Sequence, residues 1–211
     1  MRSMTKRPIF IISLNWVDWL TLGSLLLTSL GLLSAFQNDL ALSITLMLVA
    51  MFVDMLDGLL ARRFGLEDEF GRYLDSFCDV FTYLLLPLFI LYQSGMQDLL
   101  SIAALFVFLA SGLLRLSRFN IIGTVEQGGI QYHLGLPVIW SQLVVVLAFP
   151  AWHWLGIITH YLLILILPAM SILMICNIRF RKPTQYAFLT GLILSVAVMY
   201  AFLHFFGIRK P

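Results

Sequence analysis

Charged residues and cysteines are both scarce in this sequence. Only 11% of its 211 residues are charged, whereas 61% are hydrophobic, and its two cysteines are Cys78 and Cys176. So little charge cannot cover a water-soluble domain built around that much apolar sequence. Both cysteines fall in apolar stretches, so a disulfide framework is not expected. The composition therefore excludes a soluble domain, and no nucleic-acid partner is expected.

Long apolar runs fill most of the chain, and runs of about 20 residues are typical of helices that cross a membrane. They cover residues 15–36, 39–61, 72–93, 98–118, 136–155, 160–178 and 186–206. We therefore predict an all-α fold, a polytopic membrane helical bundle with about seven spans, in a single integral membrane domain over residues 1–211. Residues 1–14 mix basic and apolar side chains, which suits a cytoplasmic segment, either an interfacial helix or a basic tail.

Basic residues are distributed unevenly between the two sides of the predicted membrane domain. If seven spans alternate in direction, all 13 lysines and arginines except Arg209 and Lys210 fall on one side. Basic residues concentrate on the cytoplasmic side of membrane proteins. We therefore expect a multi-pass protein of the cell (inner) membrane, with its N-terminus and the 54–79 region facing the cytoplasm.

One pattern of eight residues between positions 54 and 79 indicates chemistry. It reads Asp54-x2-Asp57-Gly58-x2-Ala61-Arg62-x8-Gly71-x3-Asp75-x3-Asp79. Residues three or four apart share a helix face, so a hairpin can bring the two aspartate pairs together. Four carboxylates gathered in a poorly hydrated place repel one another unless hard divalent cations bind them. The pattern predicts two Mg²⁺ or Mn²⁺ ions.

Two such ions about 4 Å apart commonly clamp a phosphate during displacement at phosphorus. Small side chains at Gly58 and Ala61 leave room for a nucleotide or phosphate against the helix, and Gly71 permits a similarly close approach. Taken singly, each aspartate would be a solvated surface group and each small residue a packing site. Their combined spacing favours phosphoryl-group chemistry.

The pattern resembles in full the signature of the CDP-alcohol phosphatidyltransferase family. That resemblance implies a membrane enzyme with a core of six helices, usually a homodimer. Such an enzyme moves a phosphatidyl group from CDP-diacylglycerol or a related CDP-lipid to an alcohol and releases CMP. The resemblance also implies that Asp54, Asp57, Asp75 and Asp79 hold the two ions, with Asp79 as the catalytic base. It places Asp57, Gly58, Ala61, Arg62 and Gly71 at the nucleotide.

The identity of the alcohol must be argued from other segments. Leu114–Asn120 and Leu134–Pro137 are similar to stretches of bacterial and archaeal phosphatidylserine synthases, although Val80–Pro87 stands where those enzymes favour a Phe-Gly pair. L-serine is therefore the expected acceptor, and glycerol 3-phosphate or an inositol phosphate is the alternative. Arg115 and Arg118 can face one anion beside Asn120, so these three are the candidate acceptor-binding residues. The same arginines could instead reach lipid phosphates.

One residue outside the motif completes the predicted site. Thr21, in the first span, is a candidate to hydrogen-bond the nucleotide, although a threonine in a membrane helix often bonds its own backbone.

Aspartates within a membrane also occur in cation transporters. A transporter would move metal ions across vesicles without a CDP-lipid, and that function would explain neither the small residues of the motif nor Arg62.

Overall fold

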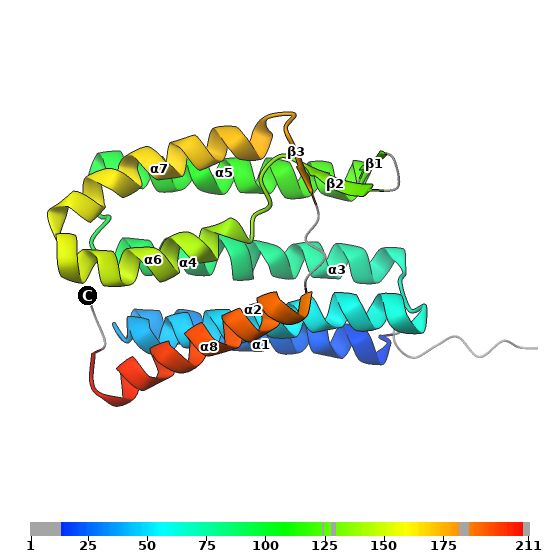
Figure 1. Cartoon of the computed structure of the whole chain (residues 1–211), viewed down its shortest axis with the longest axis horizontal. Helices are drawn as coiled ribbons and strands as arrows, with labels where there is room; N and C mark the ends of the chain where they lie inside the picture. Colours follow the sequence, from blue (N-terminus) through cyan, green and yellow to red (C-terminus); the bar gives the residue numbers. More distant parts are fainter. Residues whose placement is uncertain (1–13, 124, 128–129, 182–185, 209–211) are drawn as a thin grey trace, which may run out of the picture.

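The chain folds as a bundle of helices whose axes run along the longest dimension of the molecule (Figure 1). This computed structural model describes residues 14–123, 125–127, 130–181 and 186–208, so the predicted segment 1–14 lies almost wholly outside it. The helices are α1 (Trp16–Phe36), α2 (Leu40–Phe64), α3 (Glu69–Asp79), α4 (Leu86–Gln93), α5 (Leu99–Ile122), α6 (Trp140–Leu155), α7 (Ile157–Ile175) and α8 (Tyr186–Phe205). A π-helical segment, η1 (Val80–Leu85), joins α3 to α4. The predicted helical bundle is confirmed.

Five of the described helical segments are long and apolar enough to cross a membrane, which makes the chain a multi-pass membrane protein. They are α1, α2, the continuous segment Glu69–Gln93, α5 and α7. The predicted span 136–155 is shorter than expected, because its first residues form a turn and α6 begins only at Trp140. Its 16 residues reach about 24 Å, less than the roughly 30 Å of a bilayer's hydrocarbon core.

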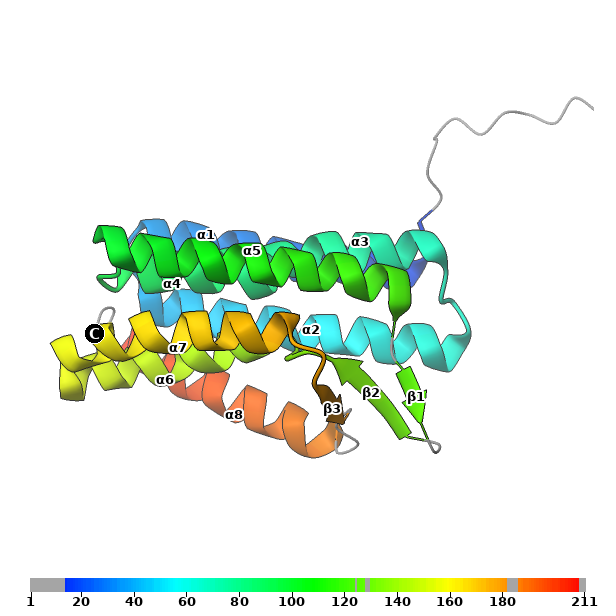
Figure 2. The ribbon, with the colours of Figure 1, turned by 90° about the horizontal axis from the view of Figure 1, so that it is seen from above.

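A small antiparallel sheet, which the all-α prediction did not include, lies near the ends of α5 and α7 (Figure 2). Its strands are β1 (Val125–Gln127), β2 (Ile130–Leu134) and β3 (Arg179–Arg181), in the order β1-β2-β3. Gly135 follows β2 with a φ of 77°, and its N–H donates to the Ile178 carbonyl at 2.8 Å. A Cβ at this position would lie 2.2 Å from the Met174 carbonyl oxygen, so only glycine fits here. This contact holds the chain between β2 and α6 against the end of α7.

Helix α1 buries its small polar residues and turns its leucines outward. Thr21, Ser24 and Thr28 are buried, and the Thr28 hydroxyl lies 2.8 Å from that of Thr82 in η1. On the opposite face, Leu26, Leu30 and Leu33 are 61%, 42% and 57% exposed. Lipid tails are as apolar as leucine, so membrane helices associate through close packing of small residues and interhelical hydrogen bonds. The contacts of α1 follow this rule.

Two aspartate–histidine pairs connect helices at the end of the bundle away from the α2–α3 turn. His160 Nε2 lies 3.0 Å from Asp98 Oδ2, and His204 Nδ1 lies 2.8 Å from Asp39 Oδ2. Asp98 also accepts hydrogen bonds from the Ser101 hydroxyl and backbone N–H, which hold the pKa of the Asp98 carboxyl below its ordinary value. These pairs join α5 to α7 and α2 to α8.

Candidate active site

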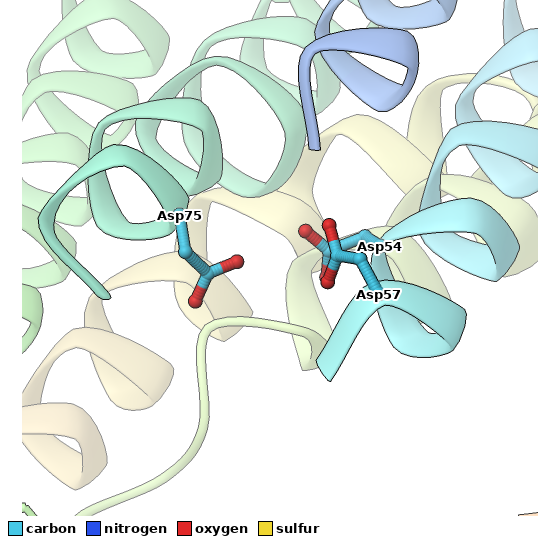
Figure 3. A group of neighbouring side chains, drawn as sticks. All are labelled: Asp54, Asp57 and Asp75. Atoms are coloured by element: carbon cyan, nitrogen blue, oxygen red, sulfur yellow. The ribbon is translucent and has the colours of Figure 1, made fainter. Parts of the chain in front are cut away.

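A tight turn between α2 and α3 places the two halves of the aspartate motif side by side. Helix α2 ends at Gly65, whose φ of 64° is a left-handed conformation that suits glycine. Asp68 then caps α3, accepting a hydrogen bond from the Gly71 N–H at 2.6 Å. Figure 3 shows the result: Asp54 and Asp57 on α2 face Asp75 on α3 across a narrow space.

Three of the four motif aspartates form a compact carboxylate cluster. Asp54, Asp57 and Asp75 each offer one carboxylate oxygen, and these atoms all lie within 4.8 Å of one another. Thr21 Oγ1 donates to Asp57 Oδ2 at 2.7 Å, and Tyr83 OH donates to Asp54 Oδ2 at 2.7 Å. Asp54 Oδ1 is buried and has no hydrogen-bond partner among the described residues. An all-oxygen donor set with a buried free oxygen fits a hard divalent cation.

Asp79, the fourth motif aspartate, falls outside this group of three. It is the last residue of α3, where the chain enters η1. The charges that act on it most strongly are those of Asp75, Asp54 and Arg115. Asp79 is therefore close enough to the carboxylate cluster and to Arg115 of α5 for their charges to act on it.

A cavity of about 660 Å³ adjoins the cluster. The residues predicted to contact a nucleotide all line it: Thr21, Asp57, Gly58, Ala61, Arg62 and Gly71. Asp75 lines it as well, and its remaining walls come from Asn15, Val17, Asp18, Leu66, Glu67, Asp68, Glu69, Arg72 and Phe119. The cavity thus joins two motif aspartates to two arginines, and its volume is in the range of small-molecule binding sites.

Asp18 was not predicted as a site residue, yet it belongs to the cavity wall. It is 3% exposed, and its Oδ2 accepts a 2.8 Å hydrogen bond from the Asn15 N–H in a capping box. A Cβ on Gly71 would lie 3.2 Å from Asp18 Oδ1 and 3.0 Å from Asp68 Oδ1. Glycine at position 71 therefore lets α3 approach α1. The sequence signals for Asp18 were its position one turn before Thr21 and the resemblance of Asp18–Thr21 to the same family, but its place near the end of the span favoured a solvated side chain.

The three predicted acceptor-binding residues lie outside the cavity. Arg115 is 8% exposed, and its Nε has no hydrogen-bond partner among the described residues. Arg115 and Arg118 share a small separate depression near the end of α5. Asn120 Oδ1 accepts a 2.8 Å hydrogen bond from the Ser76 hydroxyl, which connects α5 to α3 beside Asp75. Of the three, Arg115 carries a charge that acts on Asp79.

Together, the fold and the site define a polytopic membrane protein with a carboxylate centre suited to divalent cations beside a cavity suited to a nucleotide. Residues 14–207 match the family model for CDP-alcohol phosphatidyltransferase, and the chain belongs to this family.

Several curated proteins are similar to the chain. A CDP-diacylglycerol–serine O-phosphatidyltransferase of Methanocaldococcus jannaschii is 32% identical over 171 residues, which are 79% of this chain and 77% of that protein. The protein of the same name from Bacillus subtilis is 28% identical over 61% of this chain and 71% of its own length. An archaetidylserine synthase of Methanothermobacter thermautotrophicus is 30% identical over 72% of this chain and 64% of its own.

Proposed function

We propose that this protein transfers a phosphatidyl group from CDP-diacylglycerol, or a related CDP-lipid, to the hydroxyl of L-serine and releases CMP. The observation that carries this proposal is the carboxylate cluster of Asp54, Asp57 and Asp75 at the edge of a cavity that also holds Arg62 and Arg72. Family membership supports the transfer chemistry. The names of the similar proteins from M. jannaschii and B. subtilis support serine as the acceptor.

In this proposal the CDP portion of the lipid occupies the cavity. Gly58, Ala61 and Gly71 leave room for it, Thr21 stands beside Asp57, and Arg62 offsets phosphate charge. When bound, two Mg²⁺ or Mn²⁺ ions at the four motif aspartates would neutralise the pyrophosphate and make the lipid phosphorus more electrophilic. The chain's own contribution is to hold acidic oxygens on both sides of the place where the pyrophosphate binds.

Asp79 and Arg115 are the residues proposed to handle serine. The serine hydroxyl oxygen bonds to the lipid phosphorus, the bond from that phosphorus to the CMP oxygen breaks, and Asp79 accepts the hydroxyl proton. Arg115, whose charge acts on Asp79, is suited to hold the serine carboxylate. Arg118 and Asn120 would support this end of α5, the latter through its hydrogen bond with Ser76.

An acceptor assay on the purified full-length protein tests the function. CDP-diacylglycerol and Mn²⁺ or Mg²⁺ are supplied with labelled L-serine, glycerol 3-phosphate, an inositol phosphate or choline, the last because phosphatidylcholine synthases also match part of the chain. We expect lipid product from serine alone. Product from another acceptor alone would contradict serine, and no product from any acceptor would contradict the transferase function. Asp79→Asn should abolish turnover while CDP-lipid binding persists.

We further propose that the protein lies in the cell (inner) membrane, with the end of the bundle that carries the aspartate motif facing the cytoplasm. We also propose that it acts as a homodimer. The clustering of arginines at that end supports the orientation. A membrane-impermeant thiol reagent should label Glu67→Cys in inverted vesicles but not in right-side-out vesicles, with Cys78 and Cys176 replaced. The opposite labelling would reverse the orientation, and a single-chain mass in detergent would contradict the dimer.

A further inference from the structure

The two oxygens of the Asp54 carboxylate have different surroundings. Oδ2 accepts the 2.7 Å hydrogen bond from Tyr83 OH, whereas Oδ1 is buried without a hydrogen-bond partner among the described residues. Leaving a buried acceptor unpaired costs free energy, so such an atom usually has a ligand that is absent from the protein itself. With Oδ2 taken by Tyr83, Oδ1 is the oxygen left to face a cation.

Tyr83 owes its position to an irregular segment of helix. It is 4% exposed and lies in η1, the π-helical segment that begins directly after Asp79. The wider π turn changes the direction in which later side chains project compared with a regular α-helix, and π turns inside helices often occur at functional sites. Here the turn puts Tyr83 on the side of its helix that faces Asp54 of α2.

Helix α6 stabilises this irregular segment through hydrogen bonds to its backbone. Ser141 Oγ donates to the Tyr83 carbonyl at 2.5 Å, and Gln142 Nε2 donates to the Thr82 carbonyl at 3.2 Å. Ser141, Gln142 and Thr82 are each at most 2% exposed. Carbonyls in a distorted helix need partners, since little water reaches the interior of the bundle. These bonds therefore hold the backbone of η1, and with it the tyrosine ring, in one place.

We propose that Tyr83 is a positioning residue for metal binding: its hydroxyl fixes the Asp54 carboxylate so that Oδ1 points into the cluster. Groups that hydrogen-bond a metal ligand orient it, and losing one typically lowers metal affinity about 10- to 100-fold. The inference rests on the proposed metal-dependent function and adds a residue outside the aspartate motif. It also gives α6 a role at the metal site, through Ser141 and η1.

The test compares two buried tyrosines of the full-length protein. Tyr83→Phe keeps the ring and removes only the donor to Asp54. Tyr200→Phe is the matched control, because Tyr200 is fully buried and donates a 2.7 Å hydrogen bond to the Val146 carbonyl of α6 and not to a motif aspartate. Mn²⁺ binding to each purified variant is measured without substrate from the electron paramagnetic resonance signal of free Mn²⁺.

We expect Tyr83→Phe to weaken Mn²⁺ binding about tenfold, with kcat at saturating metal within about twofold of wild type. Tyr200→Phe should bind Mn²⁺ as wild type does. Added to Asp54→Asn, Tyr83→Phe should cause no further loss, because the oriented carboxylate is already gone. If Tyr83→Phe does not fold, Ser141→Ala, which releases η1 from α6, should weaken Mn²⁺ binding in the same direction.

Equal Mn²⁺ affinity in wild type and Tyr83→Phe would overturn the proposal, as would equal losses in the two tyrosine variants. Failure of the inference is distinguishable from failure of the proposed function. Wild-type protein that neither binds Mn²⁺ nor forms product would refute both. Wild-type protein that does both, beside a Tyr83→Phe variant with unchanged affinity, would refute only the role of Tyr83.

Discussion

Replacing Asp75 with asparagine should stabilise the metal-free protein while destroying its response to metal. Asp75→Asn keeps the shape of the side chain and removes one of three ionisable carboxyl groups whose oxygens lie within 4.8 Å of one another. Two unit charges at that separation repel by about 3.5 kcal/mol at an effective dielectric constant of about 20. Water in the adjoining cavity screens part of this repulsion, so a net gain of about 1–2 kcal/mol is expected.

Thermal unfolding of the detergent-solubilised protein, followed by tryptophan fluorescence, measures both effects. In EDTA, Asp75→Asn should raise Tm by about 2–8 °C over wild type, using the scaling for chains of this length. Adding MnCl₂ should raise the Tm of the wild type but not that of the variant, since binding to the folded state alone stabilises it.

Glu69→Gln is the control for this experiment, because Glu69 lines the same cavity with a side chain that is 76% exposed and lies outside the cluster. It should melt like wild type in EDTA and keep the Mn²⁺ response. The reasoning would be refuted if Asp75→Asn melted at or below the wild-type temperature in EDTA. A full Mn²⁺ response in that variant would refute it as well.

Three other substitutions probe separate parts of the structure. Gly135→Ala should lower Tm more than Gly65→Ala, since both glycines have positive φ but only Gly135 meets a backbone oxygen, at 2.2 Å from an added Cβ; equal melting losses would contradict this contact. Thr21→Val should weaken Mn²⁺ binding about tenfold by removing the donor to Asp57; a Mn²⁺ titration that matches wild type would exclude that role. Arg115→Gln should raise KM for serine about tenfold or more and leave KM for the CDP-lipid unchanged, which steady-state kinetics would show; an unaltered serine KM would remove Arg115 from the acceptor site.

The helices and the aspartate hairpin were predictable because their signals are local. Apolar runs of about 20 residues mark spans, and aspartates three residues apart must share a helix face. The sequence therefore predicted that Asp54 and Asp57 would face Asp75. Asp79 was expected in the same group, but it lies outside it, at the junction with η1. The roles of these residues stay predictions.

The remaining features depend on contacts between distant positions. Tyr83 meets an aspartate 29 residues away, and Ser141 meets the Tyr83 carbonyl 58 residues away. No spacing in the chain encodes either contact, and a π turn has no composition that distinguishes it from an α turn. The pairing of β2 with β3 was missed for a similar reason, since two helices separate these strands in the chain. The pairing of β1 with β2 is local, and the apolar runs used to find helices do not detect strands this short. Gly135 lies in the Leu134–Pro137 stretch of the family resemblance, but its contact with Met174 depends on how the chain folds.

Helix α1 buries its polar side chains and exposes its leucines, and this arrangement has a practical consequence. Its hydroxyl-bearing face is buried and makes interhelical hydrogen bonds, while Leu26, Leu30 and Leu33 on the opposite face are 42–61% exposed. Exchanging these leucines for glutamine or lysine would make this surface of the bundle more soluble in water and would leave the hydrogen bonds between α1 and its neighbouring helices in place. A redesign for aqueous buffer can therefore begin on the outer face of this helix and leave the cavity beside the carboxylate cluster unchanged.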